Sequence, residues 1–209
     1  MKVLVACEYS GVVRNAFAKR GHDAYSCDIL DSLDNSGKHF KQDVIELLHP
    51  KYNWDLIIAH PPCTYLCSSG ARWYYHPEDK HLPVSQRRPH PLYPNRKEDK
   101  RQAVDFFLNF AHYASVNNVK MCIENPIGVM SKWQKPTQII QPYHFGDKVS
   151  KATCLWLWNL PALVPTNVVE PETAVTSGGK KHCPWFSNNK KLRSVTFQGI
   201  ANAMAEQWG

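Results

Sequence analysis

Short apolar runs alternate with amphipathic stretches in the first part of the chain. Residues 2–6 (KVLVA), 22–29 (HDAYSCDI) and 55–59 (DLIIA) predict strands, and a weaker run at 39–44 predicts another. The stretch 12–20 carries apolar side chains at helical spacing and is followed by a glycine, a common helix terminator. Strands that alternate with helices predict a parallel α/β sheet with helices on both faces.

The second half of the chain continues this pattern with longer elements. Residues 97–115 carry apolar side chains at helical spacing, and 120–124 (KMCIE) and 153–158 (TCLWLW) predict two further strands. A last helix is predicted over 197–208. A chain of 209 residues is within the range of one domain, so residues 1–209 are expected to form a single domain.

Two segments do not fit either pattern. Residues 70–96 contain five prolines, which exclude a regular helix or a central strand, so a long loop or lid is predicted there. Residues 161–193 are also rich in loop-forming residues and contain several lysines.

The charge balance points to the kind of partner. The chain has 25 Lys and Arg against 18 Asp and Glu, a net charge of +7, which favours a polyanion. No apolar run reaches the length of a membrane span, so no membrane association is expected. The first residues lack an export signal, which together with the odd number of cysteines, seven, predicts a cytoplasmic protein.

A metal site is not expected. Cys63 with Cys67, and His182 with Cys183, are the groupings with ligand-like spacing. Neither has a second pair of ligands at the distance that zinc sites show.

Acidic residues follow three of the predicted strands: Glu8, Asp28 and Asp43. Ligands of such sheets bind at the carboxyl ends of the strands, but the first turn has a lone glycine, Gly11, where a dinucleotide needs G-x-G-x-x-G. S-adenosylmethionine, which has no phosphate, is compatible with this turn. Glu8 would meet its methionine amine or sulfonium, Asp28 its ribose and Asp43 its adenine amine. Alternatively, Glu8 caps the helix and both aspartates are solvated turn residues.

The sequence HPPC (60–63) follows the strand 55–59 directly. Prolines fix φ and remove backbone donors, so Cys63 is presented at the strand end instead of pairing in a ladder. A nucleophilic cysteine needs a thiolate, which nearby cations such as Arg72 would favour. The alternative is a structural proline corner with an incidental thiol.

Glu124 ends the strand 120–124 and is followed by Asn125 and Pro126. This strand and the strand 55–59 are expected to be neighbours, which places Cys63 and Glu124 at adjacent strand ends. A thiolate that adds to a ring carbon while an acid holds a ring nitrogen activates that ring for substitution.

Five short motifs in chain order resemble the DNA (cytosine-5) methyltransferase family over most of the chain. They are MKVLVACEYSG (1–11) with Asp28, similar to the cofactor-binding opening; HPPCTYLCSSG (60–70), similar to the Pro-Cys motif; IENP (123–126), similar to Glu-Asn-Val; Lys151-Ala152-Thr153, similar to a reduced Arg-x-Arg; and FQGIANAM (197–204), similar to the closing motif.

This resemblance implies a Rossmann-like, S-adenosylmethionine-dependent sheet that acts on a cytosine flipped out of DNA. Cys63 would add to C6, Glu124 would contact N3 and the exocyclic amine, and Lys151 or Thr153 would hold O2, before C5 takes the methyl group. Asn125 would shape the adjoining loop. The residues implied at the cofactor are Glu8, Tyr9, Ser10, Gly11, Asp28, Asp43 and Pro61.

The chain departs from the family in its motifs and its size. Lys151 and Thr153 replace two arginines, which weakens a bidentate hold on the base. Residues 161–193 are too few for a full target-recognition domain, so low or short-site specificity is predicted. Cations interleaved with aromatics in 70–96, and a second basic cluster, are expected to hold duplex or single-stranded DNA. The residues expected at DNA are Arg72, Arg87, Arg88, Arg96, Lys97, Lys180 and Lys181, and charge reversal of Arg87 and Arg88 is expected to weaken binding.

Three other functions are compatible with the sequence. The first is C5 modification of a free pyrimidine nucleotide or of RNA. The second is a catalytically degenerate fold retained for nucleic-acid binding. The third is a cysteine hydrolase, which needs a histidine near Cys63; His60 precedes two prolines and is expected to point elsewhere.

Overall fold

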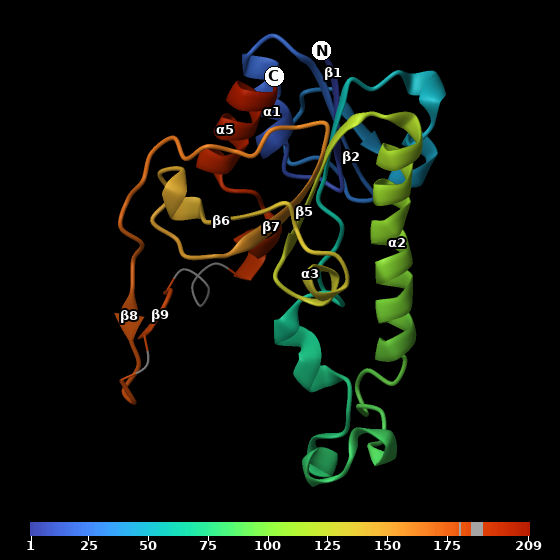
Figure 1. Ribbon diagram of the computed structural model, residues 1–209, viewed down its shortest axis with the longest axis vertical. Coiled ribbons are helices and arrows are strands. Elements are labelled where there is room, and N and C mark those ends of the chain that lie inside the picture. The colour runs from blue at the N-terminus through green and yellow to red at the C-terminus, as the bar shows by residue number, and fades with distance from the viewer. Residues whose placement is uncertain (180, 185–189) are drawn as a thin grey trace.

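Seven strands form one sheet in the computed structural model, which describes residues 1–179, 181–184 and 190–209 (Figure 1). The strand order is β3-β2-β1-β4-β5-β7-β6; the first five are parallel, and β7 runs antiparallel to both of its neighbours. The strands are β1 (Lys2–Ala6), β2 (Asp23–Asp28), β3 (His39–Lys41), β4 (Leu56–Ala59), β5 (Lys120–Pro126), β6 (Gln138–Ile140) and β7 (Thr153–Trp158), with a separate hairpin of β8 (Ala174–Val175) and β9 (Lys181–His182).

Helices cover both faces of this sheet. The α-helices are α1 (Val12–Lys19), α2 (Arg96–Asn117), α3 (Val129–Trp133) and α5 (Gln198–Trp208). Short 3₁₀ helices connect them: η1 (Val44–Leu47), η2 (Pro50–Tyr52), η3 (Ser68–Trp73), η4 (Pro77–His81), η5 (Val84–Gln86), η6 (Pro142–His144) and η7 (Lys190–Ser194).

The core consists of two layers separated by the sheet. Because side chains alternate along a strand, Val3 and Val5 of β1 pack with α1 and α5 on one face, around Phe17. Leu4 packs on the opposite face with α2, through Phe107. The predicted Rossmann-like α/β sheet with helices on both faces is therefore confirmed.

The structure differs from the expected elements in segments that are too short to show a clear hydrophobic pattern. The weak strand expected over 39–44 is shorter, because Asp43 leaves β3 and accepts the N–H of Ile45 as the cap of η1. The three-residue strand β6 was not expected, since its segment is too short to show a period.

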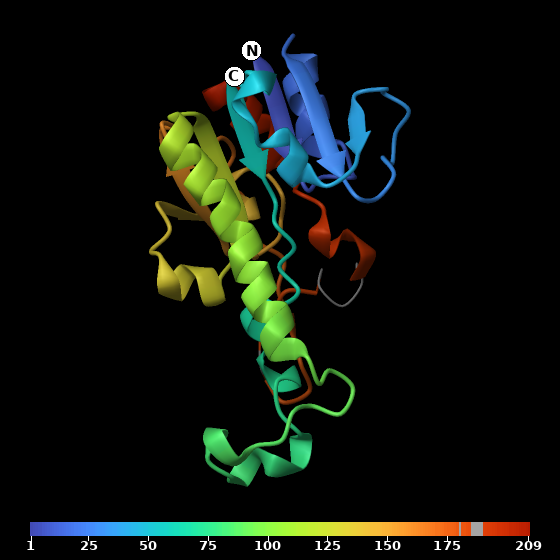
Figure 2. The ribbon, with the colours of Figure 1, turned by 90° about the vertical axis from the view of Figure 1, so that its right-hand side faces the viewer.

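The segment 70–96, called the arm from here on, projects beyond the carboxyl edge of the sheet (Figures 1 and 2). Figure 2 shows it continuing from the amino-terminal end of α2, away from the strands. Inside the arm, Arg88 forms an ion pair with the buried carboxylate of Asp79 at 2.7 Å. The predicted long loop is thus a chain of short turns held together by its own polar contacts. Within the described part of the chain, no helix has the length and apolarity to cross a membrane.

Candidate active site

The carboxyl ends of the five parallel strands meet at one edge of the sheet, and β7 starts at that same edge. β7 runs antiparallel to β5, so its first residue, Thr153, pairs with the last residue of β5, Pro126. Lys151 precedes Thr153 by two positions. The reversed strand therefore brings both side chains to the end of β5, where Glu124 lies.

The proline turn after β4 is fixed by β5. Asn125 is buried and its Nδ2 donates to the carbonyl of Pro61 at 2.7 Å. The carbonyl of Cys63 then accepts the N–H groups of Leu66 and Cys67, at 3.0 and 2.9 Å, which closes a helical turn. Cys63 is consequently held half-buried at the strand end, as the expectation of a presented thiol requires.

Further along, the chain packs against the segment that follows β5. The N–H of Val129 donates to the carbonyl of Leu66 at 2.7 Å. A Cβ at Gly128 would lie 2.0 Å from that same oxygen, so only glycine permits this approach. The segments that follow Cys63 and Glu124 are therefore hydrogen-bonded to each other beyond the site, in addition to the bond from Asn125 to Pro61.

The electrostatic surroundings of Cys63 favour the thiol over the thiolate. Burial, followed by the neighbouring Cys67 and Glu124, raises the pKa of Cys63 to about 11, and the charge of Lys151 acts in the opposite direction. Arg72, the cation expected to assist the thiolate, instead lies over the ring of Trp73 at 4.8 Å. Among the described residues, the cation that favours the thiolate is Lys151.

Glu124 is paired with a histidine. Its Oε2 lies 3.1 Å from Nδ1 of His60, and the two side chains are 18% and 8% exposed. Burial alone would raise the pKa of Glu124, but the hydrogen bond and charge of His60, the charge of Lys151 and the hydroxyl of Thr153 bring it below its ordinary value. His60, expected to point elsewhere, is thus a member of the site.

A cavity of about 660 Å³ opens beside the proline turn. Asp28 and Asp43, which end or follow neighbouring strands, both line it, together with apolar side chains such as Phe106. Pro62 lines the cavity, whereas Pro61, the residue expected at the cofactor, is buried and bonded to Asn125. The cavity therefore combines carboxylate acceptors with an apolar wall.

Glu8 caps α1, as the alternative interpretation of this residue held. Its Oε1 accepts the N–H of Val13 at 2.7 Å and its Oε2 that of Arg14 at 3.2 Å. Burial raises the pKa of Glu8, although His60 and the two N–H groups oppose the rise. A contact between Glu8 and a methionine amine remains a prediction.

Gly11 accommodates a buried ion pair at the start of α1. It has a φ of 72°, and a Cβ there would lie 2.9 Å from Asp34 Oδ2. Arg14, whose side chain is 1% exposed, pairs with Asp34. Burial alone would raise the pKa of Asp34, but hydrogen bonds from Asn15, the N–H of Ser36 and Arg14 hold it well below its usual range. The turn at Gly11 is therefore filled by protein.

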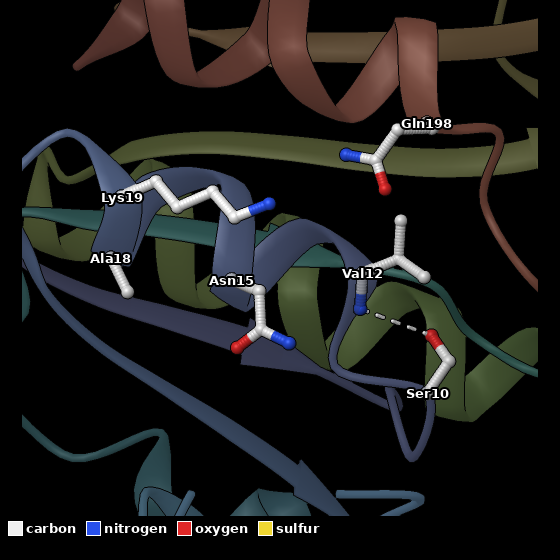
Figure 3. A pocket seen from close by; sticks show the side chains of 6 residues that line it. All are labelled: Ser10, Val12, Asn15, Ala18, Lys19 and Gln198. Carbon is white, nitrogen blue, oxygen red and sulfur yellow. Dashed lines mark hydrogen bonds between the residues drawn. The ribbon is translucent and has the colours of Figure 1, made fainter.

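Tyr9 and Ser10 also contact protein. Tyr9 Oη lies 3.4 Å from Ser194 Oγ, just before the closing helix. Ser10 Oγ donates to Glu8 and accepts the N–H of Val12 at 3.4 Å (Figure 3). Ser10 lines a second hollow of about 450 Å³. Figure 3 shows the side chains that line it, which come from α1, from Ser10 just before that helix and from Gln198 at the start of α5. Ser10 thus faces a different hollow from the one that Asp28 and Asp43 line.

The expected DNA-contacting residues fall into two groups. Arg96 is 5% exposed; its guanidinium donates to Thr64 O at 3.0 Å and lies over the rings of three tyrosines, the nearest at 5.1 Å. Arg87 donates to two carbonyls of the arm, and Arg88 pairs with an aspartate, as described above. These three arginines hold the arm together, so charge reversal of Arg87 or Arg88 would change its fold as well as its charge.

The other group is exposed. Arg72 in η3, Lys97 in the first turn of α2 and Lys181 in β9 face solvent. Lys180 lies outside the described residues. No group of three or more histidine, cysteine or acidic side chains is placed to hold a metal ion in the part of the chain that the structure describes.

Comparisons with known proteins do not establish the function of the chain. No family model and no curated protein matches the chain. Among solved structures, it is similar to one described as a candidate DNA modification methyltransferase encoded within a prophage of E. coli, with 14% identity and a TM-score of 0.49. That match covers 81% of this chain and 52% of the other, so the chain spans about half of that protein's length.

Proposed function

We propose that the protein is an S-adenosylmethionine-dependent methyltransferase that methylates C5 of cytosine in DNA through a covalent adduct at Cys63. One observation carries the proposal. Pro62 and Thr64, the two chain neighbours of Cys63, line the cavity with the acidic strand ends, while Cys63 itself senses the charges of Glu124 and Lys151. The turn that carries Cys63, the proposed nucleophile, therefore also lines the proposed cofactor cavity, and Glu124, the proposed acid on β5, acts on Cys63.

The residues around the cavity suit the proposed cofactor. Asp28 and Asp43 offer carboxylate oxygens to ribose hydroxyls and to an adenine amine, and Val44 and Phe106 offer apolar surface to the adenine ring. When bound, the cofactor would supply an electrophilic methyl group. The chain's own part is to orient it, and no phosphate-binding glycine loop is needed.

The chemistry at the ring falls to four side chains. Cys63 would lose its proton to water and form a bond from Sγ to C6, which creates negative charge on the ring. Glu124 would hold N3 and the exocyclic amine, and Lys151 and Thr153 would hold O2. Once C5 carried the methyl group supplied by the cofactor, its proton would pass to water, and the bond from C6 to Sγ would break to release Cys63. Lys151 also opposes the high pKa of the thiol, so it would serve both steps.

The polymer substrate is supported by the position of the exposed cations. The arm with Arg72, the start of α2 with Lys97, and the hairpin with Lys181 lie on the side of the molecule where the strands end (Figures 1 and 2). Such cations would neutralise phosphates without reading bases, which fits low or short-site specificity. The site would thus receive a flipped base from a strand held by the arm, the start of α2 and the hairpin.

The test is methyl transfer from labelled S-adenosylmethionine, followed by mass analysis of the nucleosides. Duplex DNA, single-stranded DNA, RNA and dCMP are compared as substrates. The wild type is expected to produce 5-methylcytosine in DNA. Cys63→Ala should abolish transfer but bind the cofactor normally by calorimetry, and Cys67→Ala, at the neighbouring cysteine, should remain active. If Cys63→Ala still methylates DNA, the proposal is wrong.

A further inference from the structure

His60 lies between two carboxylates that belong to different parts of the site. It directly follows β4, which is flanked in the sheet by β1 and β5. Its N–H donates to Ala6 O at 2.9 Å, so the residue stays in register with the end of β1. Glu124 lies on the β5 side, and Glu8, whose carboxyl interacts with the His60 charge, belongs to the turn after β1.

The imidazole is enclosed and only half satisfied. Its side chain is 8% exposed, and Nδ1 contacts Glu124. Nε2 is buried and has no hydrogen-bond partner among the described residues. A buried nitrogen without a partner is costly, and the following Pro61 is held to Asn125, which restricts movement of the backbone. This arrangement indicates a role for His60 in the reaction, because packing alone gives no reason to bury an unpartnered nitrogen.

The reaction proposed above makes a demand that Glu124 alone does not meet. The ring nitrogen N3 gains negative charge when a thiolate adds to C6, and a proton delivered there would stabilise the adduct. An ionised carboxylate has no proton to give. A proton stored on the neighbouring imidazole would supply it.

We propose that His60 is a positioning residue that orients Glu124 and stores the proton that Glu124 passes to the ring, an inference that rests on the proposed function. In the resting site the imidazole carries the proton and Glu124 is ionised. On addition of the thiolate, the Nδ1–H bond breaks and an O–H bond forms on Glu124, which leaves a neutral imidazole. The carboxyl then donates this proton to N3. The proton returns by the same route when Cys63 is eliminated.

The charges around the imidazole agree with this assignment. The charge of His60 acts on Glu8, in the turn after β1, and on Glu124, at the end of β5. Lys151, which precedes β7, also acts on Glu124, and Glu124 in turn acts on Cys63. The His60–Glu124 contact at 3.1 Å is short enough for a proton to pass directly between Nδ1 and Oε2. Burial raises the pKa of Glu124, yet His60 and Lys151 together bring it below its ordinary value, as an ionised resting state requires.

The experiment uses His60→Asn and His60→Gln, which keep a polar side chain but hold no titratable proton. The control is His112→Asn, at an exposed position on α2. The first readout needs no activity: the carboxyl ¹³C signal of Glu124, assigned by its loss in Glu124→Gln, should titrate at a higher pH in both His60 variants. The second is the pH profile of kcat for DNA methylation. The variants should lose about tenfold to a hundredfold at pH 8 and less at pH 6, with an unchanged Kd for S-adenosylmethionine.

The outcomes separate this inference from the proposed function. If the wild type methylates DNA but the His60 variants keep its pH profile, or fall by one factor at every pH, His60 is structural and the inference is overturned. If the wild type does not methylate DNA, the proposed function fails, and the storage of a proton for that reaction fails with it. A Glu124 titration that is the same with and without His60 overturns the coupling in either case.

Discussion

The thiol of Cys63 should resist deprotonation until a substrate arrives. Burial, Cys67 and Glu124 raise its pKa to about 11, against an ordinary value of 9.0. The thiolate is then about a hundredfold scarcer at neutral pH than on an unperturbed cysteine, roughly one molecule in ten thousand at pH 7. The free protein should accordingly react slowly with alkylating agents, and the rate should rise with pH up to and beyond pH 10.

Two substitutions should move this reactivity in opposite directions. Lys151→Met removes the cation that favours the thiolate, so alkylation of Cys63 at a given pH should fall by about threefold to tenfold. Glu124→Gln removes an anion that disfavours it, so alkylation should become faster. Lys148→Met, at an exposed lysine three positions before Lys151, is the control and should leave the rate unchanged.

The assay is labelling with iodoacetamide between pH 7 and 10.5, followed by mass spectrometry of tryptic peptides. Cys63 and Cys67 lie on one such peptide, so fragment ions are needed to assign the label. Half-maximal labelling of Cys63 below pH 9 in the wild type would refute the electrostatic reasoning. A faster reaction in Lys151→Met would refute the role given to that lysine.

Three further predictions concern stability and the arm. Gly199→Ala should destabilise the protein by about 3 kcal/mol and lower Tm by about 6–12 °C, because its Cβ would lie 1.9 Å from a carbonyl oxygen, whereas Gly178→Ala, with its nearest atom at 4.0 Å, should be neutral in calorimetry. Asp34 has a depressed pKa in the folded state, so its contribution to stability is present above the pKa of the unfolded chain and is lost as the pH falls below about 4; Asp34→Asn should flatten that part of a urea-midpoint profile. Arg96→Ala should open the arm to limited proteolysis, whereas Lys97→Glu should leave cleavage unchanged but weaken DNA binding and reduce its salt dependence by about one phosphate contact.

The central strands were predictable from the sequence because each contains a short, continuous apolar run. β1, β4 and β5 are buried on both faces, and such strands read as continuous hydrophobic stretches. That β4 and β5 are neighbours was expected from the class of sheet, and the structure confirms this pairing. β6 has three residues and no measurable period, so its place beside β7 was not predictable.

The arm shows why charge alone is a poor guide to contact. Arg96 stands in a basic run and has the composition of an exposed phosphate ligand, yet it is buried against tyrosine rings that lie up to 31 positions before it in the chain. No local pattern announces that contact. His60 is different, because its position directly after the strand between β1 and β5 implies that it separates Glu8 from Glu124. Topology, more than residue type, would have identified it.

The reversed direction of β7 makes the site dependent on strand alignment. If β7 slipped by two residues along β5, Thr153 would move by about 7 Å, while every side chain would still face the same layer. Trp156 opposes such a slip: it is 1% exposed, its ring meets that of Phe107 at 5.0 Å, and its Nε1 donates to Gln134 O at 2.9 Å. Trp156 therefore fixes the alignment of β7 along β5, and with it the position of Thr153 at the start of β7. Damage to it would produce a folded protein whose reactive groups no longer face one another.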